Sequence, residues 1–112
     1  MKTKNEQIAE IMGWHYDTDK GVIFVCGLGS FIDFELELHF ELAKILQQKM
    51  VDDGWKIDII NWPAVNGQKP FKRFTAYAEK FDGKRFYDSK AEADTEPAAI
   101  VALFVKVYGI EK

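Results

Sequence analysis

The stretch FKRFTAYAEKFDGKRFYD, residues 71–88, decides the fold because it reads as two strands joined by a tight turn. Residues 71–81 and 84–88 flank the dipeptide Asp82-Gly83. Asp-Gly is a strong signal for a two-residue hairpin, since a type I′ turn needs positive φ at both central positions. The sequence therefore predicts an antiparallel β-hairpin at this point in the chain.

Helix signals follow the hairpin and a strand signal precedes it. Thr95 is a candidate N-cap, and Pro97 suits the first helical turn, where a backbone N–H needs no partner. Residues 98–108 are apolar nearly all round, which is typical of a buried helix, and Gly109 can end it. Residues 55–61 alternate apolar and polar side chains and predict a strand.

The first part of the chain predicts one helix and a strand pair. Residues 4–12 carry apolar side chains at helical spacing, and Gly13 can end that helix. Residues 14–16 and 22–26 predict two strands joined by a turn.

Residues 31–52 fit two patterns. Apolar and polar side chains alternate from Phe34 to Leu42, as in a strand, yet the apolar side chains also form one helical face. Length favours a helix, because about 20 residues without a breaker is long for a strand. Ser30 and Asp33 resemble a capping box. The sequence therefore predicts a helix over residues 31–52, ended by Gly54.

In chain order these elements are a helix, two strands, a long helix, a strand, a hairpin and a helix. That order indicates an α+β fold with an antiparallel sheet between helices. A length of 112 residues suits a single domain, residues 1–112.

Composition restricts the function classes. One cysteine, Cys26, excludes an internal disulfide and any zinc site that needs two thiolates. The N-terminus lacks the apolar segment of a signal peptide. The longest apolar run, residues 98–105, is shorter than the roughly 20 residues that span a bilayer. We therefore expect a cytoplasmic protein that does not bind membranes.

Several stretches resemble a known family. They are IAEIMGWHY (8–16), SFIDFELELHFELAKIL (30–46), DDGWKIDIIN (52–61) and AEADTEPAAIVALFVKVYG (91–109). Their order and spacing resemble the phage ABA sandwich domain, a family of small phage and prophage proteins. The resemblance implies a sheet sandwiched between helices and a phage or prophage origin, and it implies no activity. The chain departs from the family pattern at residues 69–85, which are longer and more basic.

No segment carries a catalytic or cofactor motif. The glycine-rich stretch VCGLGSFIDFEL, residues 25–36, lacks the third glycine of a dinucleotide fingerprint, which Ile32 replaces. Asp33 and Glu35 would also repel a phosphate, so a strand-to-helix turn is the better interpretation. His15 and His39 lack metal-ligand spacing. We expect no cofactor, no metal and no catalytic residue.

The charge is segregated. Residues 69–90 hold seven Lys or Arg against three Asp or Glu, a net +4, and the remaining residues then sum to −7 because the chain carries −3. Aromatic side chains interleave with these cations, a combination that can track a phosphate backbone and stack bases. Lysines on a hairpin also protect a sheet edge. The candidate binding residues are Lys72, Arg73, Lys84, Arg85, Phe86, Tyr87 and, in a loop, Trp62.

Three functions compete. The leading hypothesis is a non-enzymatic phage accessory protein that binds a macromolecule, with a protein favoured over a nucleic acid and homo-oligomers allowed. The second is a nucleic-acid binder that uses the hairpin of residues 69–90. The third is a carboxylate-based enzyme that acts on a small ligand, which requires a deep apolar pocket with two convergent acids.

Overall fold

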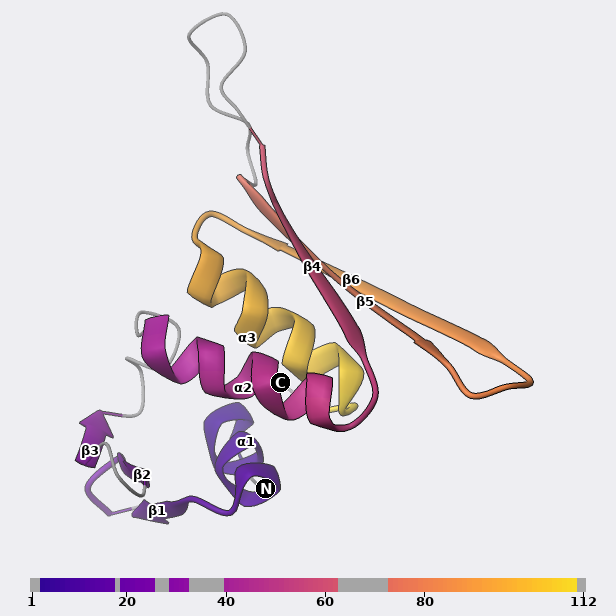
Figure 1. The fold of residues 1–112 in the computed structure, drawn as a ribbon. Helices are drawn as coiled ribbons and strands as arrows, with labels where there is room; N and C mark the ends of the chain where they lie inside the picture. The colour runs from indigo at the N-terminus through magenta and orange to yellow at the C-terminus, as the bar shows by residue number, and fades with distance from the viewer. Residues whose placement is uncertain (1–2, 18, 26–28, 33–39, 63–72, 111–112) are drawn as a thin grey trace, which may run out of the picture.

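The structure, a computed structural model, describes residues 3–17, 19–25, 29–32, 40–62 and 73–110. These residues form three helices and six strands (Figure 1): α1 (Lys4–Met12), β1 (His15–Asp17), β2 (Val22–Val25), β3 (Gly29–Ile32), α2 (Phe40–Asp52), β4 (Lys56–Asn61), β5 (Phe74–Phe81), β6 (Phe86–Ala93) and α3 (Glu96–Val107). The α+β class and the antiparallel pairing of the strands are confirmed.

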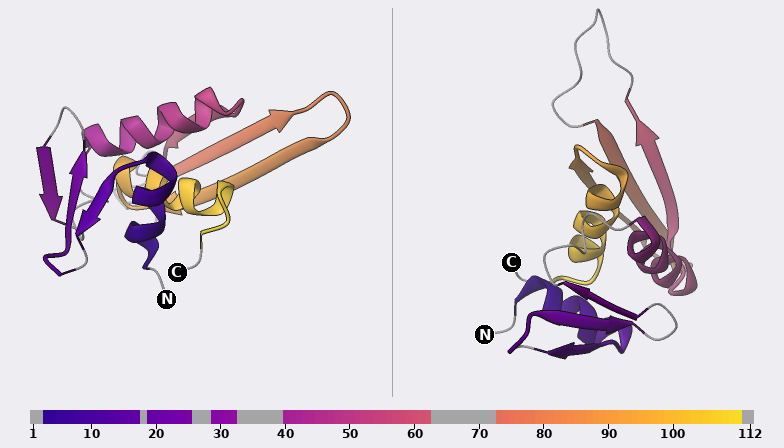
Figure 2. Two further views of the ribbon diagram at one scale, coloured as in Figure 1. Left: turned by 90° about the horizontal axis from the view of Figure 1, so that it is seen from below. Right: turned by 90° about the vertical axis from the view of Figure 1, so that its left-hand side faces the viewer.

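The strands form two sheets where the sequence had indicated one. β1, β2 and β3 pair in that order, and β4, β5 and β6 form a second three-stranded sheet. Helices lie between the two sheets in the views of Figures 1 and 2. Each sheet is a meander of neighbouring segments, so every strand finds its partner locally.

The predicted helix over residues 31–52 is wrong at its start. β3 occupies residues 29–32 and pairs with β2, with Val22 opposite Ile32 and Val25 opposite Gly29. Ser30 therefore lies in a strand and is no helix cap, and the glycine-rich stretch joins two strands, not a strand and a helix. Pairing with β2 outweighs local helix propensity here. Residues 33–39 lie outside the described residues, and α2 confirms the helix from residue 40 onward.

The predicted hairpin is confirmed, with a longer loop than two residues. The last ladder pair is Phe81 with Phe86, so residues 82–85 form the loop. The Asp82 carboxylate accepts hydrogen bonds from the backbone N–H groups of Lys84 at 2.9 Å and Arg85 at 2.7 Å. Gly83 has a φ of 94°, which costs glycine nothing. These two hydrogen bonds to Asp82 close the loop, which explains why an Asp stands at the start of the turn.

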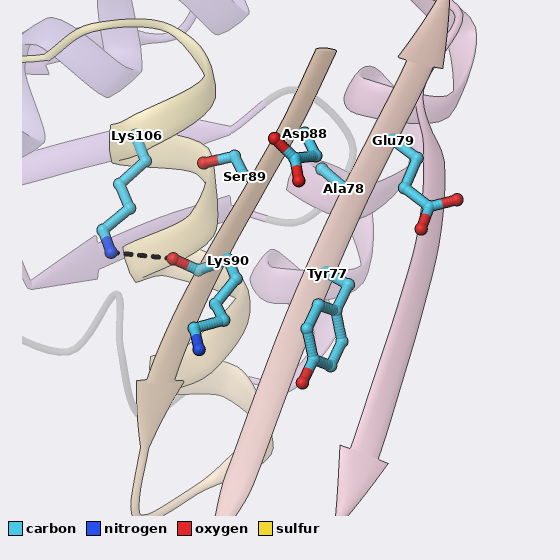
Figure 3. A pocket seen from close by; sticks show the side chains of 7 residues that line it. All are labelled: Tyr77, Ala78, Glu79, Asp88, Ser89, Lys90 and Lys106. Carbon is cyan, nitrogen blue, oxygen red and sulfur yellow. Dashed lines mark hydrogen bonds between the residues drawn. The ribbon is translucent and has the colours of Figure 1, made fainter. Parts of the chain in front are cut away.

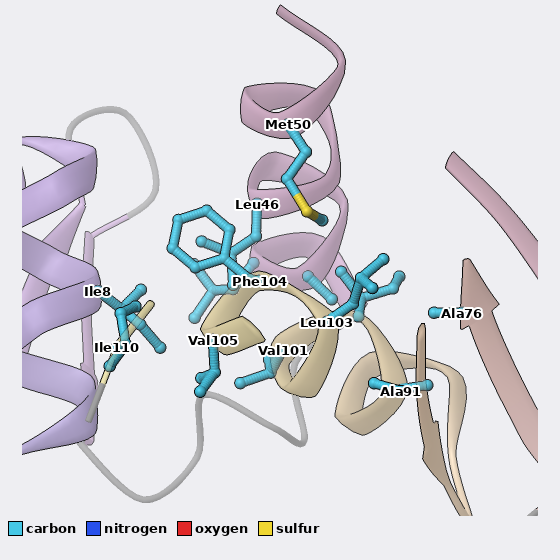
Figure 4. Close-up of a cluster of buried hydrophobic side chains, with 14 of the residues drawn as sticks. Ile8, Leu46, Met50, Ala76, Ala91, Val101, Leu103, Phe104, Val105 and Ile110 are labelled. Carbon is cyan, nitrogen blue, oxygen red and sulfur yellow. The ribbon is translucent and has the colours of Figure 1, made fainter. Parts of the chain in front are cut away.

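α3 forms the centre of the core (Figure 4). It buries six residues, and Thr95 caps it by accepting a hydrogen bond from the N–H of Ala98 at 3.3 Å, as predicted. The sheet face beneath α3 is lined by small side chains, Ala76, Ala78, Ala91 and Ala93, all buried. Small side chains let the helix approach the sheet closely, which suits a helix that is apolar on most sides.

Candidate binding surface

The β4–β5–β6 sheet covers α2 and α3 with one face and turns the other away from them (Figures 1 and 2). Side chains alternate between the faces, so Ala76 and Ala78 point to the helices while Tyr77 and Glu79 point away. Cross-strand pairing arranges the open face in rows. One row is Asp58, Tyr77 and Lys90, and a second is Lys56, Glu79 and Asp88.

Trp62 covers one end of this open face. Its Nε1–H donates to Thr75 Oγ1 at 2.8 Å, and Thr75 is only 3% exposed. The indole itself remains 43% exposed. Trp62 therefore shields a buried hydroxyl with one edge and offers the rest of its ring to solvent.

The tip of the β5–β6 hairpin extends beyond the helices (Figure 2). Phe81 and Phe86 lie directly opposite each other there and are 68% and 60% exposed. Lys84 and Arg85 occupy the loop beside them and are exposed. The predicted site residues Lys84, Arg85 and Phe86 thus come together. Tyr87, 39% exposed, points to the opposite face from Phe86 because it is the next residue along the strand.

The other predicted cations do not join this tip. Arg73 precedes β5, at the end of the strand remote from the loop, so roughly 26 Å of strand separates it from Lys84. Its Nε donates to Asn61 Oδ1 at 3.2 Å, and its guanidinium lies 5.7 Å from the Phe74 ring centroid. Lys72 lies outside the described residues. Among the described residues, the basic excess of the sequence is therefore divided between two ends of one strand.

Lys80 also faces away from the open surface. Its Nζ donates to the carbonyl of Asp53 at 2.8 Å and lies 5.6 Å from the Trp55 ring centroid. It belongs to a polar cluster beneath the sheet, where Tyr108 Oη donates to the Asp53 carboxylate and Lys49 lies 3.5 Å from it. The hydrogen bond from Tyr108 lowers the pKa of Asp53, while burial and that same bond raise the pKa of Tyr108. The cluster was not predicted from the sequence, because its members are spread along the chain from Lys49 to Tyr108 and no local pattern brings them together.

A pocket of about 500 Å³ lies along β6 (Figure 3). It is lined by Tyr77, Ala78, Glu79, Asp88, Ser89, Lys90 and, from α3, Lys106. Glu79 and Asp88 lie directly opposite each other in the ladder, and like charges in that position repel. The charged lining, with Asp88 and Lys90 exposed, differs from the deep apolar pocket that the enzyme hypothesis requires.

Lys106 closes part of this pocket from the side of the helix. Its Nζ donates to the backbone carbonyl of Lys90 at 2.7 Å (Figure 3). β6 is the last strand of its sheet, so this carbonyl belongs to an open edge. This contact was not predicted, although a signal for it exists: Lys106 is the one charged residue among the otherwise apolar residues 97–109.

Comparison with known proteins supports the fold. No family model matches the sequence, and no curated protein matches it either. The chain is similar to a phage protein from Bacillus cereus ATCC 14579 whose crystal structure is known. The TM-score is 0.56 at 17% sequence identity, over 100% of this chain and 92% of that one. The chain therefore has the fold of a phage protein, while the phage ABA sandwich family is not matched by a family model.

Two features are absent from the described ranges. Within residues 3–17, 19–25, 29–32, 40–62 and 73–110, no three His, Cys, Asp or Glu side chains are grouped to hold a metal ion. Over the same described ranges, the helices are too short or too polar to cross a membrane.

Proposed function

We propose that this chain is a non-enzymatic phage or prophage accessory protein that binds a protein partner through the tip of its β5–β6 hairpin. The observation that carries the proposal is the exposed pair Phe81 and Phe86, beside Lys84 and Arg85 at the hairpin tip. That tip extends beyond the helices (Figure 2). Aromatic residues and Arg are enriched at the centres of protein interfaces.

The tip can supply a useful share of a binding free energy. Phe81 is 68% exposed and Phe86 is 60% exposed. With about 200 Å² for each side chain and about 25 cal/mol per Å², covering both contributes about 6 kcal/mol before the costs of association. That amount suits a hot spot within a larger contact.

Charge near the tip favours a protein over a nucleic acid. Lys84 and Arg85 lie beside Asp82, and Glu79 and Asp88 form the next row of the open face. These acids offset the two cations, whereas binding to a phosphate backbone requires a positive field. Lys80 adds nothing to the tip because it bonds beneath the sheet.

The phage assignment rests on two supports. The sequence resembles the phage ABA sandwich domain, and the chain shares its fold with the Bacillus cereus phage protein. Both are consistent with a small accessory protein acting in the cytoplasm of a bacterial host.

Photocrosslinking in host cells tests the proposal. p-Benzoylphenylalanine replaces Phe86 or, as a matched control, Phe24, which is 42% exposed on the other sheet. We expect adducts from position 86 whose mass nuclease leaves unchanged, with none from position 24. A nuclease-sensitive adduct would instead support the nucleic-acid hypothesis. Equal labelling from both positions, or none from either, would refute a binding role for the tip.

A further inference from the structure

Among the described strands, β6 lies at an edge of its sheet, and its backbone groups point away from β5 at alternate residues. The N–H of Asp82 bonds the carbonyl of Arg85 at 3.2 Å, so the next pair, Phe81 with Phe86, is of the non-hydrogen-bonded kind. Alternation along the ladder then turns the N–H and C=O groups of Phe86, Asp88, Lys90 and Glu92 outward. The bond from Lys106 to the Lys90 carbonyl agrees with this direction.

We infer that a second copy of this chain pairs antiparallel with β6, with Asp88 opposite Lys90 of the partner copy and Ser89 on the twofold axis. Outward groups must meet outward groups, so residues 86, 88, 90 and 92 can pair only among themselves. A twofold axis at residue 88 or 90 places like charges opposite each other. An axis at Ser89 creates two pairs of opposite charge, Asp88 with Lys90 and Lys90 with Asp88.

A rival register has one favourable and one unfavourable charge pair, and it is more crowded. An axis at Ala91 pairs Lys90 with Glu92 and Asp88 with Asp94 of the partner copy. It also brings together the parts of β6 that α3 covers, since Ala91 and Ala93 are buried beneath that helix. The axis at Ser89 instead places the uncovered half of each β6 beside the covered half of its partner.

Lys106 modulates this pairing. Its ammonium occupies the Lys90 carbonyl at the middle of the edge, which is how lysine commonly protects an open strand. A carbonyl oxygen has two lone pairs, so strand pairing can proceed beside this bond. Loss of the Lys106 ammonium would leave the Lys90 carbonyl entirely to the backbone N–H of the partner strand. The inference concerns a different part of the sheet from the proposed function, because Phe81, Lys84 and Arg85 stay outside the paired segment. Phe86 lies at the end of that segment, opposite Glu92 of the partner copy, so a position-86 adduct with twice the mass of the chain would report the dimer and not another partner.

Charge reversal tests the register by sedimentation equilibrium of the full chain. We expect the native chain to form dimers, and Asp88→Lys or Lys90→Asp to raise the dimer Kd at least tenfold. An equimolar mixture of the two variants restores dimers, because each Lys then faces an Asp of the other chain. Asp58→Lys and Lys56→Asp, exposed on β4 of the same face, are the matched controls and leave the Kd unchanged.

Three results would overturn the inference: a native chain that stays monomeric at near-millimolar concentration, a mixture that fails to recover, or controls that behave like the edge variants. Tighter association of Asp88→Lys would assign the axis to Ala91, since the introduced lysine would then face Asp94 of the partner copy. Lys106→Met is expected to lower the Kd severalfold, and a raised Kd would contradict the competition described for Lys106.

A covalent test avoids reliance on the folding of the charge variants. Residues on a twofold axis at Ser89 form a non-hydrogen-bonded pair with a Cα separation of about 4.5 Å, which a disulfide can bridge. In a Cys26→Ser background, Ser89→Cys should become a disulfide-linked dimer under mild oxidation, and Lys56→Cys should not. Equal crosslinking of both variants, or of neither, would count against pairing at Ser89.

Discussion

Tyr108→Phe tests how the polar cluster beneath the sheet stabilises the fold. The change removes the hydroxyl that donates to the Asp53 carboxylate and keeps the ring, whose centroid lies 4.4 Å from that of Phe104. A hydrogen bond to a charged group contributes about 1.5–3 kcal/mol. The Asp53 side chain is 36% exposed and retains Lys49, so solvent reduces this contribution and we expect a loss of about 1–2 kcal/mol.

The loss depends on pH in a defined way. The pKa of Asp53 is lowered in the folded chain, so its contribution is present above the unfolded value of about 4 and is lost as pH falls through the folded value. The pKa of Tyr108 is raised, so its contribution is present below about 10 and declines as pH rises beyond that. The difference in the free energy of unfolding between the native chain and Tyr108→Phe should therefore be constant from about pH 5 to pH 9. It should become smaller below and above that range.

Urea unfolding followed by tryptophan fluorescence measures this difference at several pH values. Tyr77→Phe, on the open face of the same sheet, is the matched control and should change the free energy of unfolding by less than about 0.5 kcal/mol. If Tyr108→Phe costs no more than the control, or costs the same at pH 3 as at pH 7, the stabilising role of the Tyr108–Asp53 bond is refuted.

Three further changes probe the sheet. Ala78→Leu should lower the thermal midpoint through a cost of about 1–3 kcal/mol, because α3 leaves no room on that face, and an unchanged midpoint would show a looser core. Gly83→Ala should cost about 1 kcal/mol in urea unfolding through its φ of 94° alone, since nothing lies within 4 Å of the added methyl group. Trp62→Phe leaves Thr75 without its indole donor and should cost about 1 kcal/mol by the same assay; a neutral result would mean that the hydroxyl finds another partner.

Local signals predicted the elements that local interactions determine. Asp82-Gly83 indicated the hairpin, Thr95 the start of α3 and Gly13 the end of α1, and the structure confirms all three. Each depends on contacts within a few residues of the signal. β3 was not predicted because residues 29–32 are extended only through pairing with β2. The intrinsic propensities of these four residues contain no information about that pairing.

The residue types of the candidate site could be predicted from the sequence, but the directions of their side chains could not. The charge excess of residues 69–90 is a property of the sequence, yet alternation sends Lys80 beneath the sheet and strand length separates Arg73 from Lys84. The exposed edge of β6 could not be foreseen, since which strand is outermost depends on the pairing of the whole sheet. The hypothesis that Lys84, Arg85 and Phe86 bind a partner remains a prediction.

The position of α3 in the chain has a consequence for biosynthesis. The helix that fills the centre of the core is the last of the nine described elements to leave the ribosome. Until it emerges, the alanine-lined β5–β6 part of the sheet lacks the helix that packs on it, and α2 lacks a main packing partner. Productive folding therefore waits for α3, and a nascent chain stalled before residue 96 should stay protease-sensitive and depend on chaperones.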